Sequence, residues 1–240
     1  MQLNGGTALI TGASRGIGKA IAKSLAENGV NLALAGRSRE GLESLKGELR
    51  DFKIDVLLCE GDLAAPEIPR ELIRKTIEYF GQLDILINNA GIAYPKPLSE
   101  TTANEWDFHM AVNARAPFLL SREALPYLKK SEMATIINIS SVVGYKGYIN
   151  QGAYTASKHA LAGMTKVLAQ EVFNDGIRVH IIAPGGVDTD MLSQTRPDLD
   201  RSMLASPEEI ADIVMFILTH RGKAVMDEIN IRRYSNSPWK

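Results

Sequence analysis

The sequence contains almost no cysteine, almost no net charge and no long hydrophobic run. Cys59 is the single cysteine among 240 residues, which excludes a disulfide framework within the chain and any metal cluster built from several cysteines. The 27 basic and 28 acidic side chains leave a net charge of −1, so neither nucleic acid nor a membrane surface is an expected partner. No segment approaches the roughly 20 apolar residues of a membrane-spanning helix, and the N-terminus lacks the pattern of an export signal. Together these absences predict a cytoplasmic protein.

Short apolar runs alternate with longer amphipathic segments along the chain. This alternation is typical of β-α units around a parallel sheet, because helices then cover both faces of the strands. It predicts an α/β fold of the Rossmann type, a doubly wound, seven-stranded parallel sheet with helices on both faces. The expected strands are residues 7–10, 30–35, 56–60, 83–88, 135–140, 178–183 and 228–231. The expected helices are residues 16–28, 39–51, 66–80, 103–129, 152–174 and 207–219.

No repeat, low-complexity tract or proline-rich linker divides the chain, so residues 1–240 are expected to form one domain. The one irregular stretch, 191–205, follows the sixth expected strand. In a doubly wound sheet, ligands bind in a crevice at the carboxyl ends of the strands. This stretch is therefore expected to form a short substrate loop.

A glycine-rich turn joins the first expected strand to the first expected helix. Glycines permit a tight turn and close approach of a ligand, and the helix N-terminus that follows offers free N–H groups to a pyrophosphate. The spacing G-x3-G-x-G departs from the G-x-G-x-x-G dinucleotide pattern, and a connection that binds nothing is the alternative. The position of the turn favours nucleotide binding. The residues concerned are Gly12, Ser14, Arg15, Gly16, Ile17 and Gly18.

The end of the second expected strand indicates which nucleotide is bound. An acidic side chain at this point binds the ribose of NAD, whereas arginine accommodates the 2′-phosphate of NADP. Here no acid is present, Arg37 follows the strand, and Arg15 can approach from the glycine turn. Two solvated surface arginines are the alternative. The pattern favours NADP(H).

Tyr154 and Lys158 are four residues apart in an expected helix, which places both side chains on one face. An ammonium group near a phenol favours the phenolate and brings the phenolic proton into a useful range for acid–base chemistry. The pair alone is common on solvated helices. Ser141 adds weight, because it follows the fifth expected strand and so places a hydroxyl at the sheet edge where ligands bind.

Together with other motifs of the chain, these residues make it resemble the short-chain dehydrogenase/reductase family. The resemblance runs from Leu3 to about Met191, and several motifs follow one another in the family's order. They are T-G-x3-G-x-G at 11–18, N-N-A-G at 88–91, Asn113, Ser141 followed by Tyr154 and Lys158, and P-G at 184–185. Several motifs in register are far more specific than any one of them.

The resemblance implies a role for each residue of the catalytic set. Tyr154 would donate a proton to the substrate oxygen and Ser141 would position that oxygen. Lys158 would lower the pKa of Tyr154 and hold the nicotinamide ribose, and Asn113 would bind a water that connects the lysine to solvent. The family spacing selects Ser141 over its neighbour Ser140, which is expected to satisfy backbone groups at the strand end.

The resemblance also implies further cofactor contacts, at the adenine, the adenosine ribose and the nicotinamide in turn. They are Asp62 with Leu63, then Asn89, Ala90 and Gly91, then Pro184, Gly185, Val187 and Thr189, with Tyr154 and Lys158 completing the set. No metal site is expected, because the four histidines at 109, 159, 180 and 220 show no ligand spacing.

The predicted activity is NADPH-dependent reduction of a carbonyl to an alcohol, a reversible hydride transfer with a small molecule as substrate. A 3-oxoacyl-[acyl-carrier-protein] reductase is the first alternative. Two features disfavour it: the ends of the two long helices, at 131–132 and 174–175, are not basic, and the tail at 226–234 departs from the family's glycine-rich pattern. A regulator that binds NADP(H) without catalysis is the alternative from another class. The resemblance implies a homodimer or homotetramer built on helices 103–129 and 152–174.

Overall fold

The computed structural model describes residues 3–238, and this part of the chain forms one seven-stranded sheet. All neighbouring strands are parallel and follow the order β3-β2-β1-β4-β5-β6-β7. The predicted fold class is therefore confirmed. The strands are β1 Thr7–Thr11, β2 Asn31–Gly36, β3 Val56–Glu60, β4 Ile85–Asn88, β5 Thr135–Ile139, β6 Arg178–Pro184 and β7 Glu228–Ile231.

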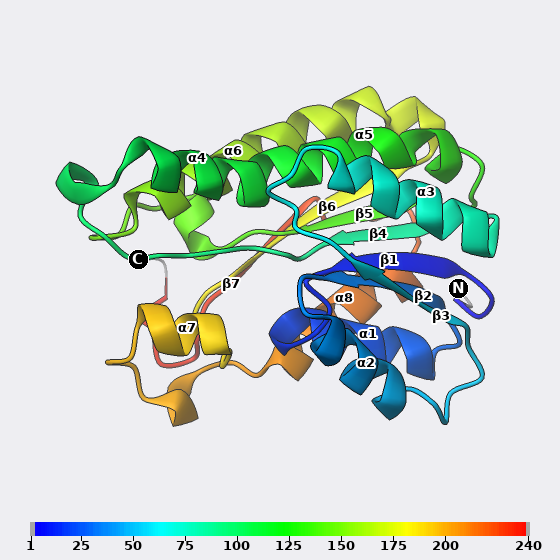
Figure 1. Ribbon diagram of the computed structural model, residues 1–240, viewed down its shortest axis with the longest axis horizontal. Helices are drawn as coiled ribbons and strands as arrows, with labels where there is room; N and C mark the ends of the chain where they lie inside the picture. Colours follow the sequence, from blue (N-terminus) through cyan, green and yellow to red (C-terminus); the bar gives the residue numbers. More distant parts are fainter. Residues whose placement is uncertain (1–2, 239–240) are drawn as a thin grey trace.

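Helices cover the sheet on both sides (Figure 1). On one side lie α1 Gly16–Glu27, α2 Arg39–Glu48 and α8 Pro207–Thr219. On the other lie α3 Ile68–Phe80, α4 Ala103–Met110, α5 Ala116–Leu128 and α6 Gly152–Glu171. Two apolar cores separate the sheet from these layers. Because successive side chains of a strand point to opposite faces, Ile10 packs in the first core and Leu9 in the second. Burial on both faces explains why the strands read as apolar runs.

The sheet reverses its winding between β1 and β4. β1 pairs with β2 on one side and with β4 on the other, and the connections run outward in opposite directions from this point. The carboxyl ends of β1 and β4 therefore splay their following loops apart, which opens a crevice for a ligand. The glycine turn follows β1, and the 88–91 motif overlaps the end of β4.

The predicted helix over 103–129 is present from Ala103 to Leu128, but it is not a regular α-helix throughout. The chain forms α4, then a π-helical turn at Ala111–Arg115, then α5. Pro117 explains the wide turn, since proline has no N–H to donate back to the preceding turn and its ring crowds the carbonyl there. Asn113 lies inside the wide turn, and its side-chain amide hydrogen-bonds with the backbone of Ile92 in the loop after β4.

Two further predicted segments differ in detail. The predicted helix 152–174 ends at Glu171 and continues as a separate 3₁₀ turn, Phe173–Asp175, before the left-handed Gly176. The stretch 191–205 is not irregular throughout, because it contains most of the short helix α7 Asp190–Thr195 and the 3₁₀ turn Arg201–Met203. Thr189 caps α7 by accepting a hydrogen bond from Leu192 N. The remaining 3₁₀ turns are Leu98–Glu100 and Val142–Gly144.

Between residues 3 and 238 no helix is long and apolar enough to cross a membrane.

Candidate active site

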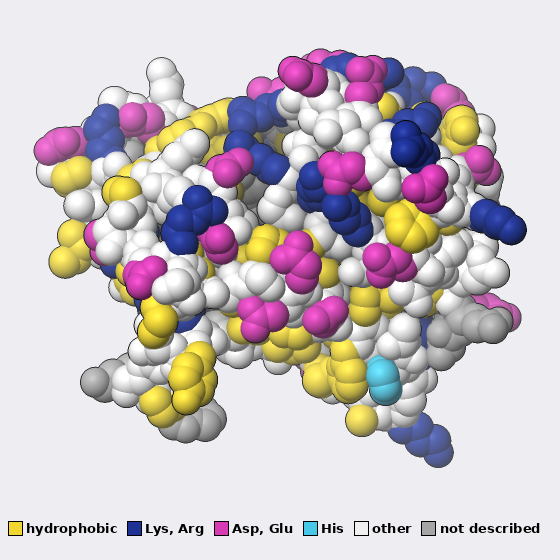
Figure 2. All heavy atoms as spheres, turned by 90° about the horizontal axis from the view of Figure 1, so that it is seen from below, with side chains coloured by type: hydrophobic (Ala, Val, Ile, Leu, Met, Phe, Trp, Pro, Cys, Tyr) yellow, Lys and Arg dark blue, Asp and Glu magenta, His cyan; other side chains and the backbone are white. Residues whose placement is uncertain are grey.

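A cleft of about 1740 Å³ runs along the carboxyl edge of the sheet. It extends from the glycine turn and the end of β2 to the loop around α7 and the C-terminal tail. Seen from the side of α1, α2 and α7, the surface is hollowed between α7 and the first two helices, with Lys and Arg side chains at the margin (Figure 2). The cleft is large enough for a dinucleotide and a small substrate together.

The glycine turn leaves no room for larger residues. Gly12 and Gly16 have left-handed φ angles of 65° and 55°, which L side chains rarely adopt. A Cβ on Gly12 would lie 2.9 Å from Ala90 Cα, and a Cβ on Gly18 would lie 2.3 Å from Gly12 O. The turn is therefore packed backbone against backbone, with Gly12 and Gly16 lining the cleft and Gly18 beneath them.

The start of α1 is suited to an anion. The N-cap residue Arg15 makes no side-chain cap, and no acidic residue lies in the first turn. The N–H groups at this end are left for a ligand, and the positive end of the helix dipole adds to them. Ser14, Arg15 and Ile17 also line the cleft here. The turn and the helix end together fit the pyrophosphate of a dinucleotide.

The amide of Asn89 locks β4 to the glycine turn. Its Nδ2 donates to Thr11 O at 2.9 Å and to Gly12 O at 3.1 Å. Thr11 Oγ1 in turn accepts from the N–H groups of Asn89 and Ala90, each at 3.1 Å. Asn89, Ala90 and Gly91 line the cleft, but the Asn89 side chain is used to hold the turn.

The predicted pair of phosphate-binding arginines is present on the cleft, but Arg15 is already engaged. Arg37 is exposed beside Ser38, which caps α2 through Gly41 N at 3.1 Å. Arg15 Nη1 lies 3.1 Å from Asp190 Oδ2, across the cleft at the start of α7. This ion pair is more than half exposed at both ends, so it is weak and easily exchanged for another anion.

Ser141, Tyr154 and Lys158 meet at the middle of the cleft. Ser141 follows β5, and its hydroxyl lies near enough to the Tyr154 phenol to lower the pKa of that phenol. Lys158 Nζ lies 5.9 Å from the centre of the Tyr154 ring and donates to Ile139 O at 2.9 Å. The fifth strand and α6 thus bring the three predicted catalytic groups together.

Burial dominates the titration of this centre. It raises the pKa of Tyr154, and the nearby Ser141 hydroxyl lowers it by a smaller amount. Burial also lowers the pKa of Lys158 to about 8, since its side chain is 3% exposed and has no carboxylate partner among residues 3–238. The Lys158 ammonium is held by the Ile139 carbonyl, and its effect on the pKa of Tyr154 stays a prediction.

Asn113 lies behind the cleft rather than on its surface. Its Oδ1 accepts from Ile92 N at 2.8 Å, and its Nδ2 donates to Ile92 O at 2.9 Å and Ser157 Oγ at 3.0 Å. The side-chain amide therefore ties the loop after β4 to α6, and the water predicted at Asn113 stays a prediction. A Cβ on Gly91 would lie 3.3 Å from Asn113 Oδ1 and 3.5 Å from Lys158 Nζ, so this glycine lets the two groups approach each other.

Ser140 does not use its side chain as predicted. Its backbone N–H donates to Ile182 O at 2.7 Å, but its buried Oγ has no hydrogen-bond partner among the described residues. The hydroxyl packs against Gly144, where a Cβ would lie only 2.9 Å from it. Ser141 is thus the serine that faces the cleft and the tyrosine.

The remaining predicted cofactor residues all line the same cleft. Asp62 also accepts from Ala64 N at 3.0 Å, and Thr189 packs 3.1 Å from the Cβ position of Gly16. The Thr189 side chain, on the segment before α7, therefore lies against the glycine turn. The residues concerned are Asp62, Leu63, Pro184, Gly185, Val187 and Thr189.

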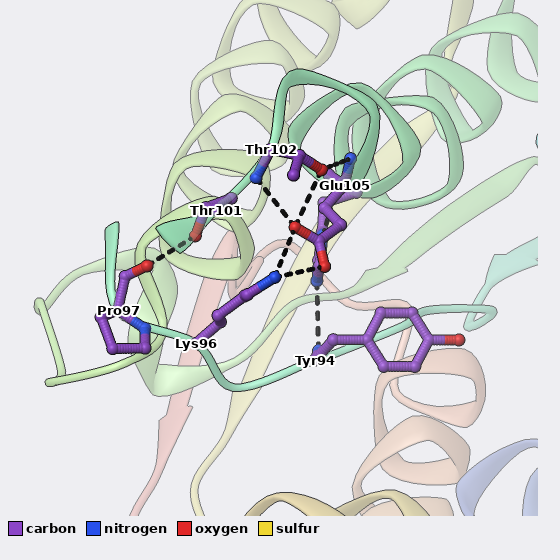
Figure 3. Close-up of polar contacts among 7 residues, drawn as sticks. Tyr94, Lys96, Pro97, Thr101, Thr102 and Glu105 are labelled. Atoms are coloured by element: carbon purple, nitrogen blue, oxygen red, sulfur yellow. Dashed lines mark hydrogen bonds and ion pairs between the residues drawn. The ribbon is translucent and has the colours of Figure 1, made fainter. Parts of the chain in front are cut away.

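A polar cluster that sequence reasoning missed supports the wall around Tyr94, which lines the cleft (Figure 3). Glu105 bonds to Thr102 and lies 2.9 Å from Lys96 Nζ, and these contacts, the backbone of Thr102 first, lower its pKa to about 2. The buried His109 accepts from Tyr94 N at 3.2 Å through Nε2. Only a capping pattern at Thr102 was visible in the sequence.

The substrate end of the cleft also contains residues that the sequence did not single out. They share no motif, because they come from the loop after β5, the segment around α7 and the tail after β7. They are Lys146, Tyr148, Gln151, Arg196, Arg201 and Arg233.

A family model described as short chain dehydrogenase matches residues 6–200 of the chain. The chain belongs to the short-chain dehydrogenase family. This membership confirms the resemblance seen in the motifs and the oxidoreductase class that they predict.

Relatives and solved structures agree with this assignment. A 3-oxoacyl-[acyl-carrier-protein] reductase, FabG, of Staphylococcus aureus is 34% identical over 229 residues, which cover 91% of this chain and 93% of the relative. The structure of an alcohol dehydrogenase from Thermococcus sibiricus complexed with 5-hydroxy-NADP superposes with a TM-score of 0.89 at 30% identity, covering 97% and 98% of the two chains. A short chain dehydrogenase from Burkholderia cenocepacia in complex with NADP gives 0.88 at 32% identity, covering 96% and 98%.

Within the short-chain dehydrogenase family, this chain keeps the whole motif set on one cleft surface or directly behind it. Gly18 and Asn113 are the two predicted site residues that do not line the cleft. Gly18 packs against Gly12, and Asn113 hydrogen-bonds with Ser157 of α6. Among residues 3–238, no three His, Cys, Asp or Glu side chains are grouped as metal ligands would be.

Proposed function

We propose that this short-chain dehydrogenase reduces the carbonyl of a small molecule to an alcohol with NADPH, and catalyses the reverse oxidation with NADP⁺. The observation that carries the proposal is the meeting of Ser141, Tyr154 and Lys158 on a cleft whose other end is a glycine cradle. When bound, NADPH would supply the hydride for the carbonyl carbon.

The residues of the chain then have separate tasks. Tyr154 holds a proton in its buried phenol and delivers it to the substrate oxygen, so that no free alkoxide forms. The raised pKa of Tyr154 keeps this proton in place until a carbonyl accepts it. Ser141, whose hydroxyl lies beside the same phenol, orients the substrate oxygen. Lys158 adds positive charge beneath the reacting groups and can hold the nicotinamide ribose, and Asn113 keeps α6 in register with the loop after β4.

Preference for NADP(H) follows from the end of β2. Arg37 lies on the cleft with no carboxylate next to it in the segment 35–39, so a 2′-phosphate at this strand end meets a cation. Arg15 joins it only by leaving Asp190, which costs little because that pair is exposed. The NADP complexes of the two solved relatives support this preference.

The cofactor assignment is tested by dissociation constants measured from the fluorescence of NADPH and NADH. NADPH is expected to bind at least about 10-fold more tightly, because two charge-assisted contacts are lost with NADH. Arg37→Met is expected to weaken NADPH and leave NADH unchanged. Equal or tighter binding of NADH by the wild type would contradict the proposal.

A 3-oxoacyl-[acyl-carrier-protein] reductase is the second candidate, and the named FabG relative favours it. The structure offers little positive charge for an acidic carrier at the helix ends, where Lys129 is neutralised by Asp175 at 2.9 Å. A 3-oxoacyl thioester presented free and on the carrier protein separates the candidates. A kcat/KM that is at least about 100-fold higher on the carrier would establish the carrier-protein reductase.

A regulator that only binds NADP(H) is tested by NADPH consumption at 340 nm against diketones, aldehydes, pterins and a 3-oxoacyl thioester. The complete set of Ser141, Tyr154, Lys158 and Asn113 supports catalysis, since a regulator has no need of all four. Absence of NADPH oxidation with every carbonyl would favour the regulator.

The homodimer or homotetramer and the cytoplasmic location remain parts of the proposal. Exposed apolar side chains on α5, α6 and the turn after it support an assembly through this face, because they leave apolar surface uncovered. They are Phe118 at 45%, Val167 at 54% and Phe173 at 76% exposed. Size-exclusion chromatography with light scattering is expected to give a dimer or tetramer, and a monomer would contradict this part.

A further inference from the structure

The C-terminal tail closes the substrate end of the cleft. β7 is an edge strand paired with β6, with Ile231 opposite Pro184, and Gly185 N donates to Ile231 O at 2.7 Å. The chain that leaves β7 therefore passes directly beside the Pro184–Gly185 segment, where the nicotinamide is expected. Residues 231–233 and 236–238 line the cleft together with Tyr154 and Lys158.

Arg232 folds the tail so that Arg233 turns toward Gly186. Nη1 of Arg232 donates to the carbonyl oxygens of Arg233, Tyr234 and Asn236 at 3.1, 3.1 and 2.7 Å. Asn236 N also donates to Arg233 O at 3.0 Å, which completes a tight turn. The Cβ position of Gly186 lies 2.8 Å from Arg233 Cδ and 3.2 Å from its Nε. Any side chain at position 186 would displace Arg233, so Gly186 leaves the space that the arginine occupies.

The guanidinium of Arg233 is only partly satisfied. Its Nη2 donates to Asn236 Oδ1 at 3.0 Å, but its buried Nε has no hydrogen-bond partner among the described residues. A buried donor without a partner is unfavourable, and a ligand that accepts from it removes the cost. Arg233 forms no ion pair within 4 Å in the part of the chain that the structure covers. The charge of Arg233 contributes to the lowered pKa of Asp198, but both oxygens of that carboxylate accept hydrogen bonds from Arg196 at 2.7 Å.

Two acids on the substrate side of the cleft are already paired with other arginines. Asp188 is paired with Arg201 at 2.7 Å and Asp190 with Arg15 at 3.1 Å. Lys146 lines the cleft as well and forms no ion pair with any residue from 3 to 238. The substrate end therefore carries surplus positive charge, although the chain as a whole has a net charge of −1.

We propose that Arg233 binds an anionic group of the substrate, a carboxylate or a phosphate, and so selects anionic carbonyl compounds. The planar fork of Nε and Nη matches two acceptor oxygens of such a group, and a partly buried site strengthens the contact. Lys146 adds charge at the mouth of the same end. This specificity rests on the proposed carbonyl reduction and adds the class of substrate to it.

The test compares charged and neutral substrates of matched shape. Initial rates of NADPH oxidation are measured with 4-oxopentanoate against its methyl ester, and with dihydroxyacetone phosphate against dihydroxyacetone. The preference is the ratio of kcat/KM for the charged member to that for the neutral one. The variants are Arg233→Met, which removes the charge, Arg233→Lys, which keeps it without the fork, and Arg50→Met, which removes an exposed arginine that does not line the cleft. The dissociation constant of NADPH and the melting temperature are measured for each.

The wild type is expected to prefer the charged member of at least one pair about 30-fold, and the pair concerned identifies carboxylate or phosphate. Arg233→Met is expected to lower this preference to about 1, Arg233→Lys to an intermediate value, and Arg50→Met to leave it unchanged. Affinity for NADPH is expected to stay within about 3-fold in all variants.

Three results would overturn the proposal. If the wild type reduces the neutral carbonyls and shows no preference in either pair, the inference fails and the carbonyl reductase stands. If the preference survives in Arg233→Met, or if this variant weakens NADPH more than about 10-fold, Arg233 does not select the substrate. If none of the carbonyl compounds supports NADPH oxidation by the wild type, the proposed function fails and this specificity fails with it.

Discussion

The two ends of the cleft are built in different ways. At the glycine end, backbone packs against backbone, and the Cβ positions of Gly12 and Gly18 lie within 2.9 Å of other backbone atoms. At the substrate end, exposed ion pairs hold the chain, among them Arg201 with Asp188 and Arg196 with Asp198. Backbone packing admits few sequences, whereas exposed pairs are weak and replaceable. The first end is therefore suited to a constant ligand, and the second can change with the substrate.

Adding one methyl group at the glycine end is expected to have the largest effect on NADPH affinity and on the free energy of unfolding. In Gly18→Ala the new Cβ would lie 2.3 Å from Gly12 O, so the turn has to move. We expect affinity for NADPH to fall about 100-fold and the free energy of unfolding to fall by about 3 kcal/mol, as in overpacked cores. Fluorescence titration and urea denaturation measure the two quantities.

Gly163→Ala is the matched control, because a Cβ at Gly163 in α6 meets nothing within 4 Å. It is expected to keep NADPH affinity and to raise the free energy of unfolding by about 0.5–1 kcal/mol, since alanine is the better helix former. Equal effects of the two substitutions would contradict the view that backbone packing defines the glycine end.

The centre of the cleft is tested through the titration of Lys158. Burial lowers its pKa from 10.5 to about 8, so between these values the unfolded chain binds more protons than the folded one. The cost of burying the ammonium is present below pH 8 and is relieved as the pH rises toward 10.5. The difference in unfolding free energy between the wild type and Lys158→Met is expected to rise by about 2 kcal/mol from pH 8 to pH 10.

Urea denaturation of both proteins across this pH range gives the difference directly, and other titrating groups cancel in it. A difference that stays flat or falls with pH would show that the lysine is not buried as a charge in the folded protein.

Breaking an ion pair at the substrate end is expected to have the smallest effect. In the Asp188–Arg201 pair, the Asp188 side chain is 33% exposed and the Arg201 side chain is 65% exposed, so solvent screens the attraction between them. A double-mutant cycle with Asp188→Asn and Arg201→Met is expected to give a coupling of about 0.2–1 kcal/mol in urea denaturation, and NADPH affinity within about 3-fold. A coupling above about 2 kcal/mol would contradict the view that the substrate end is held only by weak, exposed ion pairs.

The sequence predicts the glycine end better than the rest, for a physical reason. Gly12, Gly16 and Gly18 form a local pattern, and their requirement for small residues can be read without knowing the fold. The alternation of apolar runs likewise predicted all the strands of the described sheet within about two residues of their observed ends.

Features that depend on long-range contacts were not predictable. The π turn around Asn113 precedes Pro117 and brings Asn113 to the backbone of Ile92, and helical periodicity indicates neither. Arg233 is an ordinary basic residue in the sequence, and its place on the cleft follows only from the pairing of β7 with β6. Arg15 was expected to face a phosphate, and its contact with Asp190, 175 positions away, follows no local pattern.

In the proposed mechanism Tyr154 supplies the proton for carbonyl reduction while the rest of the cleft holds the cofactor. The most direct test is single-turnover oxidation of NADPH by the wild type and by Tyr154→Phe, with NADPH affinity measured on the same samples. The account predicts a rate about 1000-fold lower in the variant and NADPH affinity within about 3-fold of the wild type. A variant that retains more than about a tenth of the wild-type rate would contradict the account.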